Sequence, residues 1–227
     1  MNVYTNAMRL HSLLGLLAAC LLATATAKAD VIIGNGPDST VGGGTSIFAG
    51  VLKGVGFTMT STIYVGSARL SLSTGNSNVS PTVYLMSDAG NKPGSVLTTF
   101  QGPVLSSDPT PLAYLFTLPT AYQLVNGTTY WLVAAGSSNQ ALFLWRGDDT
   151  PTGAHATYLG ARLSGDSGAS YAASAVANSF ELLSAAAPPP PPPPPPAGVP
   201  EPSVAITLSA MGLIVFTRSR RRRALHS

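Results

Sequence analysis

NGTTYWLVAA, residues 126–135, decides the fold of this chain. Asn126-Gly127 is a strong signal for a tight hairpin turn, because both residue types tolerate a left-handed backbone. From Thr128 to Ala135 the run is apolar at nearly every position, not at every second one. A strand without a polar face is typical of the centre of a sheet that is covered on both sides. The stretch therefore predicts a hairpin turn that leads into a buried central strand containing Trp131.

The sequence around this stretch reads as further short strands separated by turn residues. Thr82 to Ser87 is dense in strand formers, and Ala68 to Ser73 alternates with two leucines on one face. Other candidate strands are Val55–Met59, Ser95–Phe100, Ala113–Leu118, Ala141–Arg146, His155–Leu163 and Phe180–Leu183. Asp30 to Ser184 carries no convincing helical stripe of three turns. We predict an all-β domain over residues 30–184, an antiparallel β-sandwich of jelly-roll-like type.

Charge is sparse and unevenly placed. Charged residues make up 9% of the 227-residue chain, which carries a net charge of +3. The part from Asp30 to Ala187 has eight acidic and five basic residues, so the positive charge belongs to the two ends. Nucleic-acid binding needs clustered Lys and Arg on the domain itself. The composition therefore excludes a nucleic-acid partner.

The last 29 residues form a different kind of segment. Val199-Pro200-Glu201-Pro202 precedes an uncharged run from Ser203 to Thr217, followed by a cluster of arginines: Arg218, Arg220, Arg221, Arg222 and Arg223. As a helix, the uncharged run would span about 22 Å, and snorkelling arginines extend that reach toward the headgroups. Basic clusters beside a membrane segment stay cytoplasmic. We expect one short transmembrane helix with its C-terminus in the cytoplasm.

This ordered trio, covering residues 199–223, resembles the PEP-CTERM sorting signal of Gram-negative bacteria. The resemblance implies recognition by exosortase, a membrane protease-transpeptidase that cuts near Pro-Glu-Pro. It also implies an exported protein that is held in the inner membrane and then released to the cell surface or the extracellular matrix. Ser209 and Gly212 make this apolar run less rich in leucine than many such tails.

The N-terminus has the features of an export signal over residues 1–29. Arg9 precedes an apolar run from Leu13 to Leu22, and Ala27-Lys28-Ala29 supplies the small-x-small pattern of a signal peptidase site. Cleavage after Ala29 makes Asp30 the first mature residue. Leu17-Ala18-Ala19-Cys20 offers an alternative, the lipobox of a bacterial lipoprotein. If Cys20 leaves with the signal peptide, the mature protein has no cysteine and no disulfide.

Residues 185–198 form a proline-rich linker. Its nine consecutive prolines, Pro188 to Pro196, would extend about 28 Å as polyproline II. Such a segment resists collapse, so we expect a stalk between the domain and the tail.

Three stretches of the domain resemble the choice-of-anchor domains of exported bacterial proteins, the type labelled R most of all. They are residues 83–88 (VYLMSD), 92–97 (KPGSVL) and 124–133 (LVNGTTYWLV). The motifs are largely structural: Pro93-Gly94 is expected to form a turn between strands, and Tyr130 with Trp131 to pack the sheet. The resemblance implies a β-sandwich carried by interchangeable surface anchors, and it brings no catalytic residues.

Candidates for chemistry within the domain are few. His155 is its only histidine and has no nucleophile-elbow pattern around it, and Glu181 is its only glutamate. We therefore assign no catalytic residue and no cofactor. A structural calcium ion remains an alternative, with oxygen ligands from Asp148-Asp149 near Asp166, or from Asp88 with Asn91.

These observations favour a non-enzymatic component of the cell envelope. We expect a structural or adhesive role in the extracellular polysaccharide matrix. The alternative is a carbohydrate-binding module, in which exposed rings form a glycan platform. The rings available are Tyr64, Tyr84, Trp131, Trp145 and Tyr158. Exposed rings favour the binding module, and buried rings favour the structural role.

Overall fold

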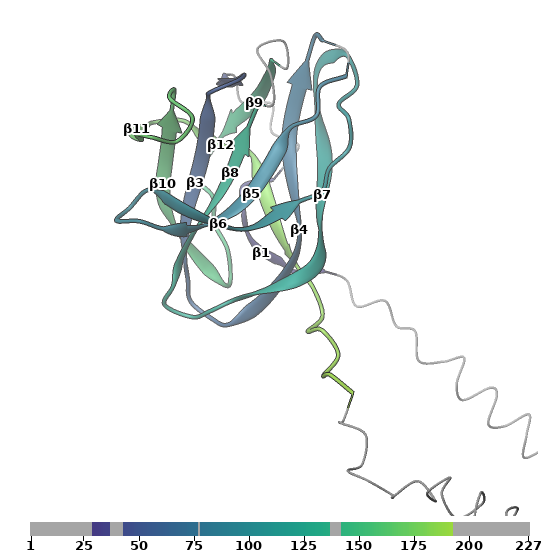
Figure 1. Ribbon diagram of the computed structural model, residues 1–227, viewed down its shortest axis with the longest axis vertical. Helices are drawn as coiled ribbons and strands as arrows, with labels where there is room; N and C mark the ends of the chain where they lie inside the picture. Colours follow the sequence, from purple (N-terminus) through teal and green to yellow (C-terminus); the bar gives the residue numbers. More distant parts are fainter. Residues whose placement is uncertain (1–28, 37–42, 77, 137–141, 193–227) are drawn as a thin grey trace, which may run out of the picture. The chain divides into compact units, whose positions relative to one another are not determined.

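The computed structural model describes residues 29–36, 43–76, 78–136 and 142–192. Within them all regular structure is β-strand, in two antiparallel sheets arranged like a sandwich (Figure 1). This confirms the predicted all-β class. The same residues contain no helix long and apolar enough to cross a membrane. The apolar run Ser203–Thr217, the Pro-Glu-Pro motif and the arginine cluster all lie outside the described residues.

The first sheet has seven strands. Its main path is β1 (Val31–Gly34), β13 (Phe180–Ser184), β4 (Ile63–Thr74), β9 (Phe143–Asp148) and β12 (Ala177–Asn178), with β7 (Asp108–Leu124) beside β4 and β2 (Gly44–Ile47) beside β9. The second sheet has six strands, in the order β11 (Ala172–Ser174), β10 (Ala156–Ser164), β3 (Leu52–Met59), β8 (Thr129–Ala135), β5 (Thr82–Asp88) and β6 (Pro93–Phe100).

The strand predicted from residues 128–135 is confirmed as β8. It lies between β3 and β5 in the middle of the six-stranded sheet, and every residue from Tyr130 to Ala135 is buried. The other eight candidate strands are also confirmed, with longer bounds in most cases. Four strands of two to four residues each were not predicted: β1, β2, β11 and β12. Such short segments carry too few residues to show a period of two.

The predicted hairpin at Asn126-Gly127 is wrong in topology. A tight turn does form, because the Thr128 N–H donates to the Val125 carbonyl and Gly127 has φ +76°. However, β7 pairs with β4 in one sheet, whereas β8 pairs with β3 and β5 in the other. The turn is therefore an arch between the two layers. Local turn chemistry fixes the reversal of the chain but not the partner of each strand.

Side chains from both sheets fill the space between them. Phe57 of β3, Leu70 and Leu72 of β4 and Phe180 of β13 are all fully buried in one cluster. Tyr130 joins this cluster, where its ring packs 6.2 Å from that of Phe57, centroid to centroid. The inner faces of the sheets thus form the main core of the domain.

Candidate functional site

Trp131 is fully buried, but on the outer face of the six-stranded sheet. Side chains alternate along β8, so Tyr130 and Leu132 enter the main core while Trp131 and Val133 point the other way. There Trp131 packs in a second cluster with Met86 and Val133. Opposite it on β3 stands Gly56, whose missing side chain leaves room for the indole ring. Burial of Trp131 is confirmed, although it does not lie between the sheets.

Residues 88–93, which we call the covering turn, shield this second cluster. The covering turn joins β5 to β6, and Figure 1 shows β6 drawn across the front of the six-stranded sheet. Pro93 is buried and packs against the backbone of Gly54 on β3. Arg162 of β10 donates from Nε to the Asn91 carbonyl at 2.8 Å, and its guanidinium carbon lies 6.0 Å from the centroid of Trp131. Strands β3, β8 and β10 thus all contribute to the contact with the turn.

Asp88 ties the covering turn to the indole. Its Oδ1 accepts the Trp131 indole N–H at 2.8 Å, and its Oδ2 accepts the N–H groups of Gly90 and Asn91. The turn itself spans Ala89–Lys92, because the Ala89 N–H donates to the Lys92 carbonyl. The prediction that Pro93-Gly94 forms the turn is therefore wrong: Pro93 already pairs with Asp88 in the ladder of β5 and β6. The hydrogen bonds from the Gly90 and Asn91 N–H groups to the Asp88 carboxylate form an Asx turn, so the chain reverses before Pro93.

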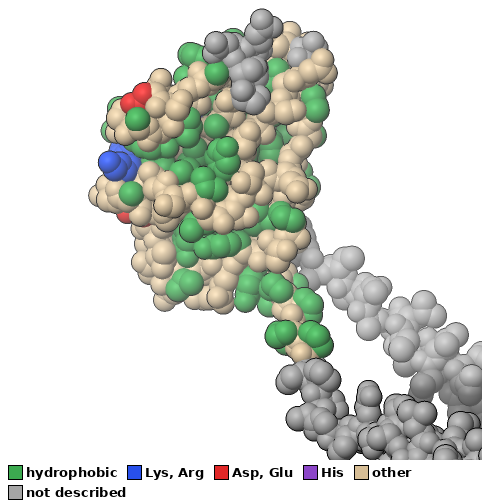
Figure 2. Space-filling model, viewed as in Figure 1, with side chains coloured by type: hydrophobic (Ala, Val, Ile, Leu, Met, Phe, Trp, Pro, Cys, Tyr) green, Lys and Arg blue, Asp and Glu red, His purple; other side chains and the backbone are tan. Residues whose placement is uncertain are grey.

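The five rings proposed as a glycan platform do not form one exposed surface. Trp131 and Trp145 are each 0% exposed, and the Trp145 indole N–H donates to the Ser179 carbonyl inside the domain. Tyr64, Tyr84 and Tyr158 are half-buried and lie on β4, β5 and β10. Figure 2 shows hydrophobic side chains over much of the face seen in Figure 1, with charged side chains toward one edge. Both tryptophans therefore act in packing.

Asp88 and Asp166, two of the aspartates considered for calcium, already have protein partners for both carboxylate oxygens. Asp166 accepts hydrogen bonds from the hydroxyls of Ser164 and Ser170 and from the Ser170 N–H. Hydrogen bonds from Ser170 and Ser164 lower the pKa of Asp166 to about 2. Asp148 Oδ1 accepts the Asp149 N–H. Across residues 29–36, 43–76, 78–136 and 142–192, no three His, Cys, Asp or Glu side chains are grouped to hold a metal ion. The carboxylates of Asp88 and Asp166 thus serve as caps of local turns, whereas Asp148 Oδ2 is buried with no hydrogen-bond partner among the described residues.

His155 contacts a serine, although not in a triad. Its Nδ1 lies 2.9 Å from the Ser61 hydroxyl, and its backbone carbonyl accepts the Thr60 N–H. Within the described part of the chain, no carboxylate hydrogen-bonds to its imidazole. Glu181, the other residue weighed for catalysis, pairs with Arg69 at 2.8 Å. Both side chains therefore have structural partners.

Lys53 is the one buried residue with a basic side chain among the described residues. It points from β3 into the domain, and its Nζ donates to the Ser174 hydroxyl at 2.5 Å and to the Val176 carbonyl at 2.9 Å. Neither partner carries a charge. Burial of the ammonium away from water lowers the pKa of Lys53 to about 8. The sequence analysis did not single out this lysine, because its burial depends on the distant segment 174–176.

The first and last residues of the domain lie side by side. The Asp30 N–H donates to the Ser184 hydroxyl at 2.8 Å, and the Ser184 N–H donates to the Asp30 carbonyl at 2.8 Å. This end of the sandwich, from which both chain termini leave, we call the terminal end. The predicted signal peptidase site, Ala27 and Ala29, directly precedes it, with Ala27 outside the described residues. Cleavage after Ala29 would leave every strand complete.

A surface pocket lies at the opposite end, where β4 finishes at Thr74, which we call the distal end. Its volume is about 360 Å³, and its lining includes Ser46, Ser73, Thr74, Asn76, Pro109 and Leu142. The Thr74 hydroxyl donates to the Leu142 carbonyl at 2.7 Å. Hydroxyl and amide groups next to apolar side chains are the kind of lining that can contact a sugar.

Comparison of the chain with known protein families, with curated proteins and with solved structures finds no match.

Proposed function

We propose that this chain is an exported cell-envelope protein whose β-sandwich is a structural or adhesive component of the extracellular polysaccharide matrix. In this proposal the tail from Val199 onward is a PEP-CTERM signal that exosortase processes. The chain begins in the inner membrane with its C-terminus in the cytoplasm. After processing, the domain reaches the cell surface or the matrix. The polyproline stalk and the short transmembrane helix belong to the same proposal.

The observation that carries the structural role is the burial of both tryptophans. Trp131 and Trp145 are each 0% exposed, and both indole N–H groups have acceptors inside the domain. A glycan platform needs exposed rings, so these two side chains support packing instead. We also propose a jelly-roll-like arrangement within the sandwich class, since β3 pairs with β8 and β10, which follow it far along the chain.

The position of the two ends of the domain supports its attachment through the chain that follows Ser184. Asp30 and Ser184 leave the domain at the same end, so a tail that follows Ser184 holds the domain by one end only. The distal end, where β4 finishes, lies at the other end of that strand from the pairing Ser184↔Val65. An adhesive surface would be reachable there.

A carbohydrate-binding module is the second candidate, favoured by the pocket at the distal end. Its exposed polar side chains, Ser46 and Asn76, offer hydrogen-bond donors and acceptors for a glycan. Tyr64, Tyr84 and Tyr158 are not fully buried and remain available as isolated stacking surfaces.

A glycan microarray separates the two candidates. The mature chain from Asp30, purified in detergent, is applied to polysaccharides and oligosaccharides, and a Ser46→Ala/Asn76→Ala variant, changed at two exposed residues of the pocket, serves as the matched control. The structural proposal predicts no selective binding, together with loss of matrix cohesion when the protein is deleted from its host. Selective binding that the double variant abolishes would instead establish the binding module.

A further inference from the structure

β13, the last strand of the domain, is hydrogen-bonded along both edges. Its residues pair with β4 from Phe180↔Leu70 to Ser184↔Val65, and with β1 from Glu181↔Gly34 to Leu183↔Val31. Phe180 and Leu182 are 0% exposed and project into the main core. A chain that leaves a domain needs no such placement, since a terminal strand can equally lie at the edge of a sheet.

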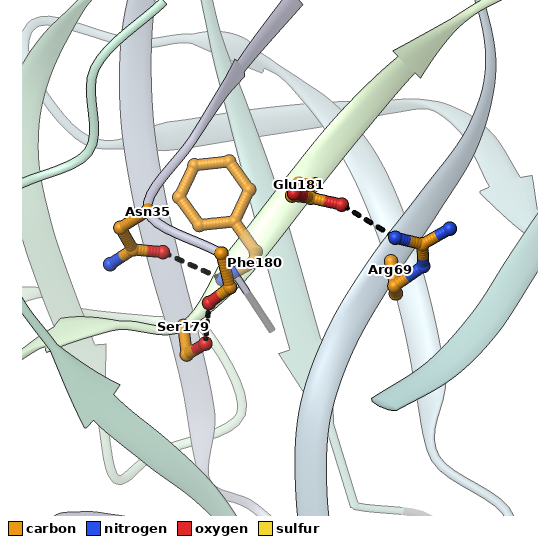
Figure 3. A network of polar contacts seen from close by, with 6 residues as sticks. Asn35, Arg69, Ser179, Phe180 and Glu181 are labelled. Atoms are coloured by element: carbon orange, nitrogen blue, oxygen red, sulfur yellow. Dashed lines mark hydrogen bonds and ion pairs between the residues drawn. The ribbon is translucent and has the colours of Figure 1, made fainter. Parts of the chain in front are cut away.

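Contacts at both ends of β13 add to the ladders. At its start, the Phe180 N–H donates to Asn35 Oδ1 at 2.9 Å, and the Ser179 hydroxyl donates to the Gly36 carbonyl (Figure 3). In the middle, Glu181 pairs with Arg69 directly across from it on β4 (Figure 3). Beyond its end, the Ala185 N–H donates to the Tyr64 carbonyl at 2.8 Å. The strand is therefore held over its whole length.

The direction of the strands decides how these contacts respond to tension. β4 and β13 are antiparallel, so β4 runs from the terminal end to the distal end and β13 runs back. Tension between the distal end and the chain after Ser184 pulls the two strands lengthwise past each other. All bonds of the ladder then carry the force together. Tension between Asp30 and the chain after Ser184 instead separates β1 from β13 one pair at a time, beginning at Val31↔Leu183.

From this arrangement we propose that β13 is a mechanical clamp, which resists tension applied through the C-terminal stalk and borne at the distal end. The inference rests on the proposed function, because it takes the stalk as the attachment of the domain. It adds a mechanical role to that function: the domain stays folded while it links its anchor to matrix held at the far end. The clamp acts along one direction only.

Optical tweezers on the full chain in detergent test the clamp. In a Cys20→Ser background, one DNA handle is attached through Pro190→Cys and the other through Gly75→Cys or Asp30→Cys. Gly75 has open space at its Cβ position, and Asp30 is exposed, so both handles leave the fold intact. The clamp predicts an unfolding force several times higher for Gly75–Pro190 than for Asp30–Pro190. Equal forces, or a higher force for Asp30–Pro190, would overturn it.

A matched pair of variants localises the resistance. Leu182 of β13 and Leu85 of β5 are both 0% exposed. Leu182→Val should lower the Gly75–Pro190 force, whereas Leu85→Val should leave it near the original value despite a similar loss of thermal stability. A force that falls equally in both variants would contradict a clamp at β13. The experiment requires neither membrane nor exosortase, so failure of processing in a host would leave its result unaffected.

Discussion

The indole ring of Trp131 lies over Gly56 of the neighbouring strand, so closely that a methyl group on Gly56 would come within 2.7 Å of the ring. Three ring carbons lie between 2.7 and 2.9 Å from that position. The ring cannot move outward freely, because Asp88 holds its N–H and the covering turn lies on it. Glycine at position 56 is thus a requirement of the buried tryptophan.

Gly56→Ala is expected to destabilise the domain by about 1–3 kcal/mol, as overpacking of a fixed ring does. Chemical denaturation followed by tryptophan fluorescence measures the change. Gly165→Ala is the control, since nothing lies within 4 Å of its Cβ position. A Gly56→Ala protein as stable as the control would show that the ring yields easily.

Trp131→Ala is expected to cost about 3–5 kcal/mol, because a large buried ring is removed beneath the covering turn. Asp88→Ala should cost about 1–3 kcal/mol, since the indole N–H loses its acceptor. Equilibrium unfolding checks both values. A stable Trp131→Ala variant that had lost binding to a glycan would reverse the order of the two proposed functions.

Lys53 gives the domain an unusual dependence on pH. Its pKa is about 8 in the folded state, below the ordinary 10.5. Between these values the unfolded chain holds a proton that the folded chain does not, so stability rises with pH. The gain should reach about 2 kcal/mol near pH ~9.5, and Lys53→Met should abolish it. Urea denaturation measured from neutral pH up to about that pH checks this prediction. Higher pH is left out, because burial raises the pKa of Tyr158 and Tyr171, and their ionisation opposes folding there. A flat profile in the original protein would contradict the lowered pKa of the buried Lys53.

The mature chain should melt cooperatively, with a β-rich circular dichroism spectrum that neither reductant nor chelator changes. Reductant has no target, because Cys20 is the only cysteine and precedes the predicted cleavage site. Chelator should have no effect, because the carboxylates of Asp88 and Asp166 already accept N–H and O–H groups. A melting temperature that falls with chelator would instead establish a structural calcium ion.

The strands were predictable from sequence where the local pattern was long enough. The apolar run 128–135 indicated a covered central strand, and the structure has β8 there, with one face against the main core and the other beneath the covering turn. What covers that second face could not be predicted, because the cover comes from residues 88–93. Asp88 was considered only as a calcium ligand, because its bond to Trp131 depends on the pairing of β5 with β8.

Contacts between distant segments could not be predicted either, because they depend on which strands pair in the folded domain. Asn126-Gly127 specified a turn, but a turn alone does not say whether the next strand pairs with the previous one or crosses to the other sheet. Lys53 in sequence resembles a solvent-exposed lysine, and only the return of residues 174–176 buries it. The adjacency of Asp30 and Ser184 likewise follows from the pairing of β1 with β13.

We expect processing of the proposed sorting signal to depend on Glu201. From the sequence, we expect Pro202 to keep the backbone of Glu201 extended, so that a helix would begin only at about that point. The carboxylate would then stand at a fixed height at the outer membrane interface, where a cationic group of the protease can recognise it. Glu201→Gln keeps the shape of the side chain and removes its charge. Deletion of Arg220 to Arg223 is the matched control, which should disturb orientation in the membrane instead.

The most direct measurement is the mass and location of epitope-tagged protein in a host that carries exosortase. We predict that the original protein loses its tail and leaves the inner membrane, whereas the Glu201→Gln protein accumulates there at unprocessed mass. Release of the Glu201→Gln protein at the original rate would contradict recognition of the charge. Retention of the original protein at full mass in the inner membrane would contradict the sorting signal itself.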